Sequence, residues 1–184
     1  MRVFLACCVE AEAAQRLYAA LEPVRALYRG AAYRVTPPDN YHVTLRFFGE
    51  LNQDEVDRVE RRVRPIADAA ARIDCRAMAL LALPNARRPA VIGLTVESAG
   101  RIEMLASHVN RVVSEDFGPP DKPFKAHLSV IRCRRGARFE ALPEDLNFEL
   151  TFARIALLRS DPADDGPRYS VLQEFQLGTG GKTC

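Results

Sequence analysis

Two short segments of the sequence share one pattern: a histidine, an apolar residue, a hydroxyl residue and a second apolar residue. Residues 42–45 read HVTL and residues 127–130 read HLSV, and the chain has only three histidines in all. Because serine and threonine are scarce in this sequence, an accidental double match has a probability of about 1%. The repeat predicts two related halves, although only this local motif recurs clearly between them.

Each motif lies in a stretch that is typical of a β-strand, rich in β-branched, aromatic and aliphatic residues. On a strand, side chains at positions i and i+2 project from the same face of the sheet. His42 therefore shares a face with Thr44, and His127 shares a face with Ser129. The intervening apolar residues point to the opposite face, where they anchor the strand in a core.

Two such pairs facing each other predict a specific chemistry. An imidazole titrates near pH 6.5, so around neutral pH one histidine can be neutral while the other is protonated. The pair can then act as a general base and a general acid. The two hydroxyls can hydrogen-bond the anionic oxygens of a group held between them, which favours cleavage of a phosphate ester and requires no metal.

Length and composition indicate an ordinary globular chain. It has 184 residues, of which 48% are hydrophobic and 27% charged, so we expect a single domain over residues 1–177 and a disordered tail at 178–184. The net charge of +2 is too small to indicate nucleic-acid binding by itself. Its apolar runs are far shorter than the roughly 18 residues of a membrane span, so no membrane association is expected.

The hydrophobic periodicity predicts an α+β fold with helices between short strands. The expected helices cover residues 10–28 (interrupted near Pro23), 52–71 (with Asn52 as a cap) and 99–117. The expected strands are 3–9, 34–36, 41–48, 73–80, 90–96, 126–133, 148–158 and 168–177. The five cysteines form no metal-binding pattern, which favours reduced thiols in the cytoplasm. We interpret Cys7, Cys75 and Cys133 as core residues.

A basic segment surrounds the second motif. Residues 122–139 contain six lysines and arginines and no acidic residue, which would attract a phosphate-rich ligand but also suits a solvated basic face. Arg132 lies at odd spacing from His127, so it needs a bulge or twist to reach the same face. Arg46 has the better parity, sharing a face with His42 and Thr44. Phe124 is the aromatic residue that we would test for stacking on a base.

The sequence resembles a known family along nearly its whole length. The resemblance rests on the segments RVFLA (2–6), HVTLRFFG (42–49), HLSVIR (127–132) and LRS (158–160), and on Tyr169. These resemble the two-histidine phosphoesterases, in particular the RNA 2′,3′-cyclic phosphodiesterases, also described as 2′-5′ RNA ligase-like proteins. The resemblance implies two pseudo-symmetric lobes, each an antiparallel sheet with helices outside, and an active-site cleft between them.

The resemblance also implies an activity: hydrolysis of the 2′,3′-cyclic phosphate of an RNA end or a nucleotide to a 2′-phosphate, without metal or cofactor. It implies that His42 is the proton donor and His127 the proton acceptor, an order that the residues alone leave open. Thr44, Ser129 and Arg132 would bind the phosphate. The second motif departs from the family pattern, with Ser129 in place of the common Thr and Ala126 in place of the frequent Pro.

The same sequence features permit other interpretations. The substrate can be a different cyclic phosphate, the reaction can be 2′-5′ RNA ligation, or the chain can be a non-catalytic protein that binds RNA ends. The two histidines can also be unrelated structural residues. We expect a cytoplasmic monomer without an obligate protein partner, and a third histidine, His108, without function at the boundary of a helix.

Overall fold

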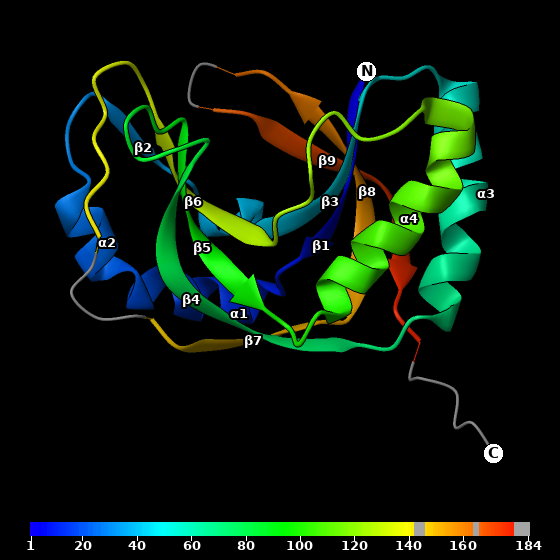
Figure 1. Cartoon of the computed structure of the whole chain (residues 1–184), viewed down its shortest axis with the longest axis horizontal. Coiled ribbons are helices and arrows are strands. Elements are labelled where there is room, and N and C mark those ends of the chain that lie inside the picture. The colour runs from blue at the N-terminus through cyan, green and yellow to red at the C-terminus, as the bar shows by residue number, and fades with distance from the viewer. Residues whose placement is uncertain (142–145, 164–165, 179–184) are drawn as a thin grey trace.

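Two antiparallel sheets form the frame of the molecule (Figure 1). The computed structural model describes residues 1–141, 146–163 and 166–178. The first sheet has the order β3 (His42–Glu50), β1 (Arg2–Cys8), β8 (Arg154–Asp161), β9 (Arg168–Gln176). The second has the order β2 (Tyr33–Val35), β6 (His127–Cys133), β5 (Val91–Glu97), β4 (Ile73–Leu83), β7 (Phe148–Phe152). The predicted α+β class with two antiparallel sheets is confirmed.

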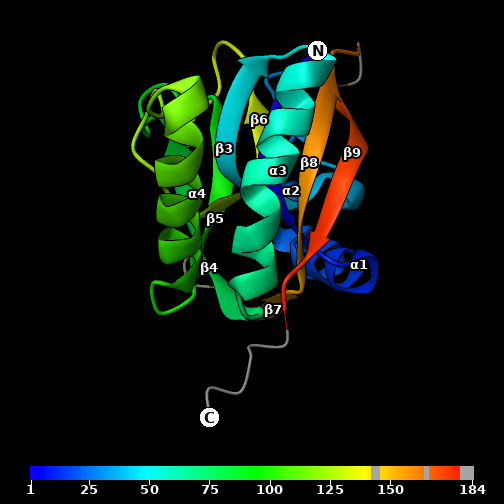
Figure 2. The ribbon, with the colours of Figure 1, turned by 90° about the vertical axis from the view of Figure 1, so that its right-hand side faces the viewer.

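The helices lie outside the sheets. The two long ones, α3 (Gln53–Ala69) and α4 (Arg101–Phe117), lie side by side against the first sheet, α4 over β3 and α3 over β8 and β9 (Figure 2). The shorter α1 (Ala11–Ala20) and α2 (Glu22–Leu27) follow β1, and α1 packs on the short 3-10 turn η1 (Pro38–Asn40). The long helices therefore cover one face of the first sheet.

The side chains of β1 alternate between the two faces of the first sheet. Val3, Leu5 and Cys7 belong to the main hydrophobic core. Phe4 and Ala6 point the other way and form a second, small cluster with residues of β8 and with Tyr169. Because successive side chains of a strand alternate between faces, one side of the sheet packs on helices and the other is left for the site.

Local signals in the sequence account for most of the helix ends. Asn52 and Glu55 form a reciprocal capping box at the start of α3, as predicted. The first helix is broken at Leu21, and Pro23 lies in the first turn of α2, where its missing N–H costs nothing. Gly118, at φ 70°, ends α4.

One predicted strand is wrong. Residues 148–158 form two strands rather than one: β7 pairs with β4 in the second sheet, while β8 pairs with β1 in the first. Only Ala153 separates them. A continuous apolar alternation contains no turn residue at this point, and the choice of a partner strand depends on contacts remote in sequence, so the local pattern does not reveal the change of sheet.

Among the described residues, no helix has both the length and the apolar character needed to cross a membrane. Cys7 and Cys75 are buried in the core, as predicted, and Cys133 is half-buried beside it; all three are free thiols. Of the predicted disordered tail, residues 179–184 lie outside the described part of the chain.

Candidate active site

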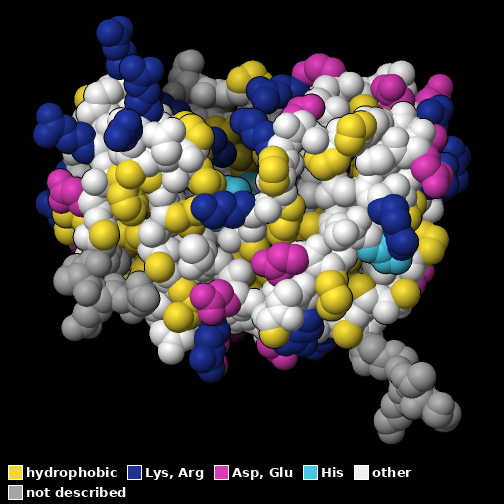
Figure 3. Space-filling model, in the orientation of Figure 1, with side chains coloured by type: hydrophobic (Ala, Val, Ile, Leu, Met, Phe, Trp, Pro, Cys, Tyr) yellow, Lys and Arg dark blue, Asp and Glu magenta, His cyan; other side chains and the backbone are white. Residues whose placement is uncertain are grey.

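The strands that carry the two motifs approach each other where the two sheets meet. Cα atoms of β3 and β6 come within 8 Å of one another, although the strands belong to different sheets (Figure 1). His42 is the first residue of β3 and His127 the first residue of β6. The fold therefore brings both predicted histidines to one region, and Figure 3 shows histidine surface in a hollow between lysine and arginine side chains.

Each imidazole ring is held by a hydrogen bond of the same kind, from Nδ1 to the backbone carbonyl two residues earlier. Nδ1 of His42 lies 2.8 Å from the carbonyl oxygen of Asn40, and Nδ1 of His127 lies 2.8 Å from the carbonyl oxygen of Lys125. A carbonyl only accepts, so Nδ1 carries the proton in each ring. Nε2 is then the nitrogen that each histidine can use to give or take a proton.

Both strands also carry a β-bulge at the same distance from the histidine. In the first sheet, Leu5 pairs with Arg46 but Ala6 pairs with Thr44, so Leu45 is an extra residue. In the second sheet, Ile92 pairs with Ile131 but Gly93 pairs with Ser129, so Val130 is the extra residue. Each bulge follows its histidine by three positions and reverses the alternation of faces beyond it.

The second bulge returns Arg132 to the face of His127 and Ser129. Val130 and Ile131 are both buried, and Arg132 is half-buried on the far side of the strand from them. Its Nη2 atom donates a hydrogen bond of 2.9 Å to the Tyr169 hydroxyl. The bulge that the odd spacing of Arg132 required is therefore present.

The first bulge has the opposite effect on Arg46, whose predicted place beside His42 and Thr44 is wrong. Arg46 is only 5% exposed and points towards α4. There it donates hydrogen bonds to Asn110 Oδ1 at 3.2 Å and to the Gly118 carbonyl at 2.8 Å. Arg46 thus ties β3 to α4.

Phe47, rather than Arg46, lies on the face of β3 that carries His42 and Thr44. Its side chain is 67% exposed, and its ring centroid lies 5.7 Å from that of Phe4. It occupies the same position after its histidine as Arg132 does in the other strand. Reasoning from the sequence missed Phe47, since a regular strand would have turned it towards the core.

An aromatic cluster surrounds His42. Its ring centroid lies 5.1 Å from Phe4 and 5.3 Å from Tyr169, and those two rings are 5.0 Å apart. Burial is the largest influence and lowers the pKa of His42 to about 4. The hydrogen bond to Asn40 opposes this shift, while the positive charges of Arg132 and of protonated His127 add to it. His42 is therefore neutral at pH 7 when no anion is bound.

The hydroxyl residues and a glycine complete the site. Thr44 and Ser129 are half-buried, each two residues after its histidine on the same strand. Gly93, opposite Ser129, lets the strands lie close: a Cβ there would lie 2.8 Å from the Leu128 carbonyl oxygen and 3.6 Å from Cδ2 of His127. A phosphate between the two Nε2 atoms would have hydroxyl and guanidinium donors within one surface.

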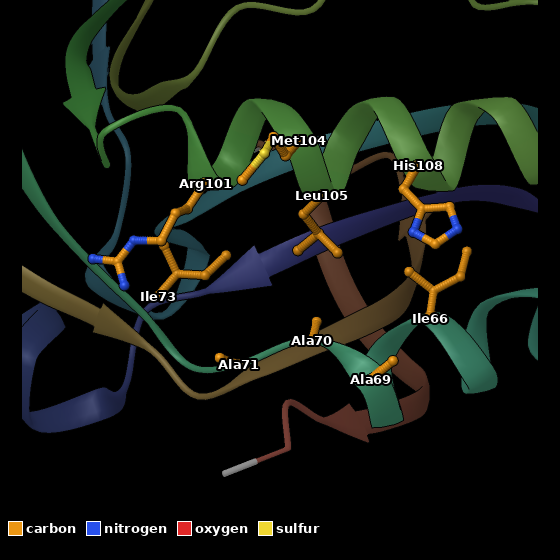
Figure 4. A pocket seen from close by; sticks show the side chains of 9 residues that line it. All are labelled: Ile66, Ala69, Ala70, Ala71, Ile73, Arg101, Met104, Leu105 and His108. Atoms are coloured by element: carbon orange, nitrogen blue, oxygen red, sulfur yellow. The ribbon is translucent and has the colours of Figure 1, made fainter. Parts of the chain in front are cut away.

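The other residues singled out from the sequence lie on α4, against the main core or exposed on the surface. Figure 4 shows His108 on α4, where it faces Ile66 of α3 across an apolar cavity of about 290 Å³. Phe124 is half-buried and packs against the main core. Outside Arg132, the cations of the basic segment are exposed on the surface: Lys122, Lys125, Arg134, Arg135 and Arg138.

Known proteins are similar to this chain in sequence and in fold. The family model described as LigT like Phosphoesterase matches residues 9–93. The RNA 2′,3′-cyclic phosphodiesterase of Thermus thermophilus is 30% identical over 184 residues, covering 96% of this chain and 90% of that protein. The enzyme of the same name from Archaeoglobus fulgidus is 28% identical over 135 residues, covering 73% of this chain and 74% of that protein.

Solved structures confirm the similarity of fold. The crystal structure of TT0787 of Thermus thermophilus has a TM-score of 0.83 and 30% sequence identity, covering 98% of this chain and 100% of that chain. E. coli LigT complexed with 3′-AMP has a TM-score of 0.76 at 18% identity, covering 96% and 97% of the two chains, which shows the fold alone.

Proposed function

The chain belongs to the LigT-like phosphoesterase family, and on this premise we infer that it is an RNA 2′,3′-cyclic phosphodiesterase. The observation that carries the inference is the pair of histidines on β3 and β6, each held through Nδ1 with Nε2 left for proton transfer. Acid–base catalysis at a phosphodiester needs one group on each side of the phosphorus, and two matched imidazoles supply them.

We propose that the cyclic phosphate lies between His42 and His127, with Thr44, Ser129 and Arg132 hydrogen-bonded to its oxygens. His127 takes a proton from water, whose oxygen attacks phosphorus. The bond from phosphorus to the ribose 3′ oxygen breaks, and His42 gives that oxygen a proton. The product then carries a 2′-phosphate and a free 3′-hydroxyl, and the step calls for no metal.

The low pKa of His42 fits this role once the substrate is bound. Burial and nearby positive charge destabilise its protonated form, so a protonated His42 gives up its proton readily. The negative charge of the bound phosphate offsets that destabilisation and favours protonation. Substrate binding thus supplies the condition under which His42 acts as an acid.

We further propose that the nucleoside base stacks on Phe47. The side chain is exposed on the face that carries His42 and Thr44, and its ring adjoins Phe4. An exposed aromatic ring beside a phosphate site is the usual platform for an unpaired base. The apolar half of the site would then hold the nucleoside and the half with Arg132 would hold the phosphate.

The wider setting is also proposed. We propose that residues 1–177 act as one two-lobed unit, because one core cluster includes residues of both sheets. We propose also that this unit is a monomer without an obligate protein partner. Free cysteines at 7, 8, 75 and 133 support a cytoplasmic location.

The test is hydrolysis of a short RNA ending in a 2′,3′-cyclic phosphate, measured in EDTA, with the position of the product phosphate identified. We expect a 2′-phosphate from the wild type and a loss of about 100-fold or more in both His42→Ala and His127→Ala. Unchanged binding of the RNA without turnover would instead indicate an RNA-end binding protein. Preference for another cyclic phosphate would indicate a different phosphodiesterase, and net 2′-5′ joining of RNA would indicate a ligase.

A further inference from the structure

A polar pocket of about 270 Å³ opens next to the histidine pair. It shares two residues with the site described above, Arg132 and Tyr169, whose side chains are hydrogen-bonded to each other. Tyr169 in turn lies 5.3 Å, centroid to centroid, from the His42 ring. The pocket is therefore continuous with the place where the cyclic phosphate would bind.

The pocket is rich in guanidinium groups. Arg34 of β2 is the Cα partner of Arg132 on β6, so the two side chains leave the sheet on the same face. Arg168, at the start of β9, also lines the pocket. Asp39 is the one carboxylate among the described lining residues, so the net charge of that lining is positive. Guanidinium groups bind phosphate oxygens through paired, charge-assisted hydrogen bonds.

The wall of the pocket contains a polar atom without a partner. Thr36 is only 4% exposed, and its Oγ1 atom has no hydrogen-bond partner among the described residues. Buried polar groups are nearly always hydrogen-bonded, so an exception beside a pocket indicates a ligand or water that completes the set.

The backbone around the pocket leaves room for Arg34 and ties the pocket's two sides together. A Cβ at Gly166 would lie 3.3 Å from Nη1 of Arg34, so a residue without a side chain suits this place. Asn40 Nδ2 donates a hydrogen bond of 3.2 Å to the Pro167 carbonyl, which joins η1 to the segment before β9. The pocket is thus bounded by two tethered segments.

We propose that this pocket binds a second phosphate of the substrate, the one on the 5′ side of the ribose that carries the cyclic phosphate. In an RNA, this group is the phosphodiester that joins the last two nucleotides. The inference rests on the proposed function, because the cyclic phosphate must lie at the histidine pair. It makes the protein selective for RNA ends over mononucleoside cyclic phosphates.

Four substrates test the proposal: adenosine 2′,3′-cyclic phosphate, the same compound with a 5′-phosphate, the dinucleotide ApA ending in a 2′,3′-cyclic phosphate, and that dinucleotide with a neutral methylphosphonate linkage. We expect kcat/KM for the charged dinucleotide to exceed that of adenosine 2′,3′-cyclic phosphate by about tenfold or more, chiefly through KM. The methylphosphonate should lose most of this gain. An equal gain from the 5′-phosphate would show that a terminal phosphate suffices, and no such gain would show that the pocket takes the internucleotide linkage.

Variants of the pocket identify the residues. Arg34→Gln and Arg168→Gln should lower kcat/KM for the charged dinucleotide about tenfold and leave adenosine 2′,3′-cyclic phosphate unaffected. Thr36→Val should retain the fold, since it replaces an unpartnered hydroxyl by a methyl group of similar shape, and should reduce the same preference. Arg61→Gln, at an exposed position of α3, is the matched control and should change neither rate.

The two proposals fail in distinguishable ways. If none of the four substrates is hydrolysed, the proposed function is wrong. If adenosine 2′,3′-cyclic phosphate is hydrolysed but the charged and methylphosphonate dinucleotides react equally fast, only the second phosphate site is wrong. Equal losses on every substrate in Arg34→Gln, Arg168→Gln and Thr36→Val would also contradict it.

Discussion

The strands β3 and β6 hold their histidines with the same backbone device but surround them differently. Each Nδ1 donates to the carbonyl two residues earlier, and each strand bulges three residues later. Around His42 lie the rings of Phe4 and Tyr169. Five positions after the histidine, β3 presents Phe47 whereas β6 presents Arg132. In both strands the backbone hydrogen bond thus determines which ring nitrogen exchanges the proton. The neighbouring side chains determine the charge of each half of the site and what that half binds.

The largest expected effect separates the two histidines by role. With a phosphodiester whose leaving group is 4-nitrophenolate, protonation of the departing oxygen matters little. We expect His42→Ala to lose less than about tenfold on this substrate but about 100-fold or more on the cyclic phosphate. His127→Ala should lose about 100-fold or more on both, because the water must still be deprotonated. The opposite result would exchange the roles of acid and base.

Substitutions of Arg132 and Arg46 test whether the two bulges place one arginine in the site and the other in a structural contact. Arg132→Gln should lower kcat/KM by about 10- to 100-fold through lost phosphate contacts, with little change in the free energy of unfolding. Arg46→Gln should lower the free energy of unfolding by about 2–4 kcal/mol, because it leaves carbonyl and amide partners at α4 unsatisfied, and should retain kcat. Urea denaturation and steady-state kinetics measure the two quantities. A loss of kcat in folded Arg46→Gln would contradict the assignment of faces.

Phe47 tests the apolar half of the site. Phe47→Ala should raise KM for RNA ends by roughly tenfold and leave kcat within about twofold, since base stacking contributes about 1–3 kcal/mol. Met104, on α4, is 66% exposed and nearly matches Phe47 in this respect. Met104→Ala should therefore leave both constants unchanged. Equal effects of the two substitutions would remove Phe47 from the binding surface.

The smallest expected effect is a shift in titration. We expect the NMR signals of the His42 ring to titrate near pH 4 in the free protein and at higher pH once a nucleoside 2′-phosphate is bound. His127→Gln should raise the pKa of His42 in the free protein, because it removes one of the positive charges that lower it. A His42 that titrates near its ordinary 6.5 would show that its aromatic surroundings leave it solvated.

The same shift affects stability in acid. Because the pKa of His42 is lower in the folded protein, the unfolded chain binds a proton more readily. The contribution of neutral His42 to the free energy of unfolding is therefore complete above about pH 6.5 and is lost as the pH falls towards 4. Thermal denaturation of the wild type and His42→Gln across that range should show a smaller decline in the variant.

Periodicity in the sequence predicted the helices and most strands, because each depends on local spacing. The meeting of the two histidine motifs was expected instead from their repetition and from the family resemblance. Periodicity failed where one residue decides the geometry. Leu45 looks like an ordinary strand residue, so its bulge, and hence the places of Arg46 and Phe47, could not be foreseen, whereas the odd spacing of Arg132 indicated the bulge in β6. The change of sheet at Ala153 and the contact of Tyr169 with Arg132 depend on tertiary pairing, which no local pattern contains.

The bulges at Leu45 and Val130 act on a strand as a frameshift acts on a coding sequence. If β3 ran as a regular strand with every residue retained, Arg46 would lie on the site's face and Phe47 on the core face. Substitutions after the bulge alter one contact at a time, whereas the loss or gain of a bulge at constant length exchanges the two faces together. A related chain that lacks one residue at the place of Leu45 or Val130 should therefore have a regular strand there and keep the same side chains on each face.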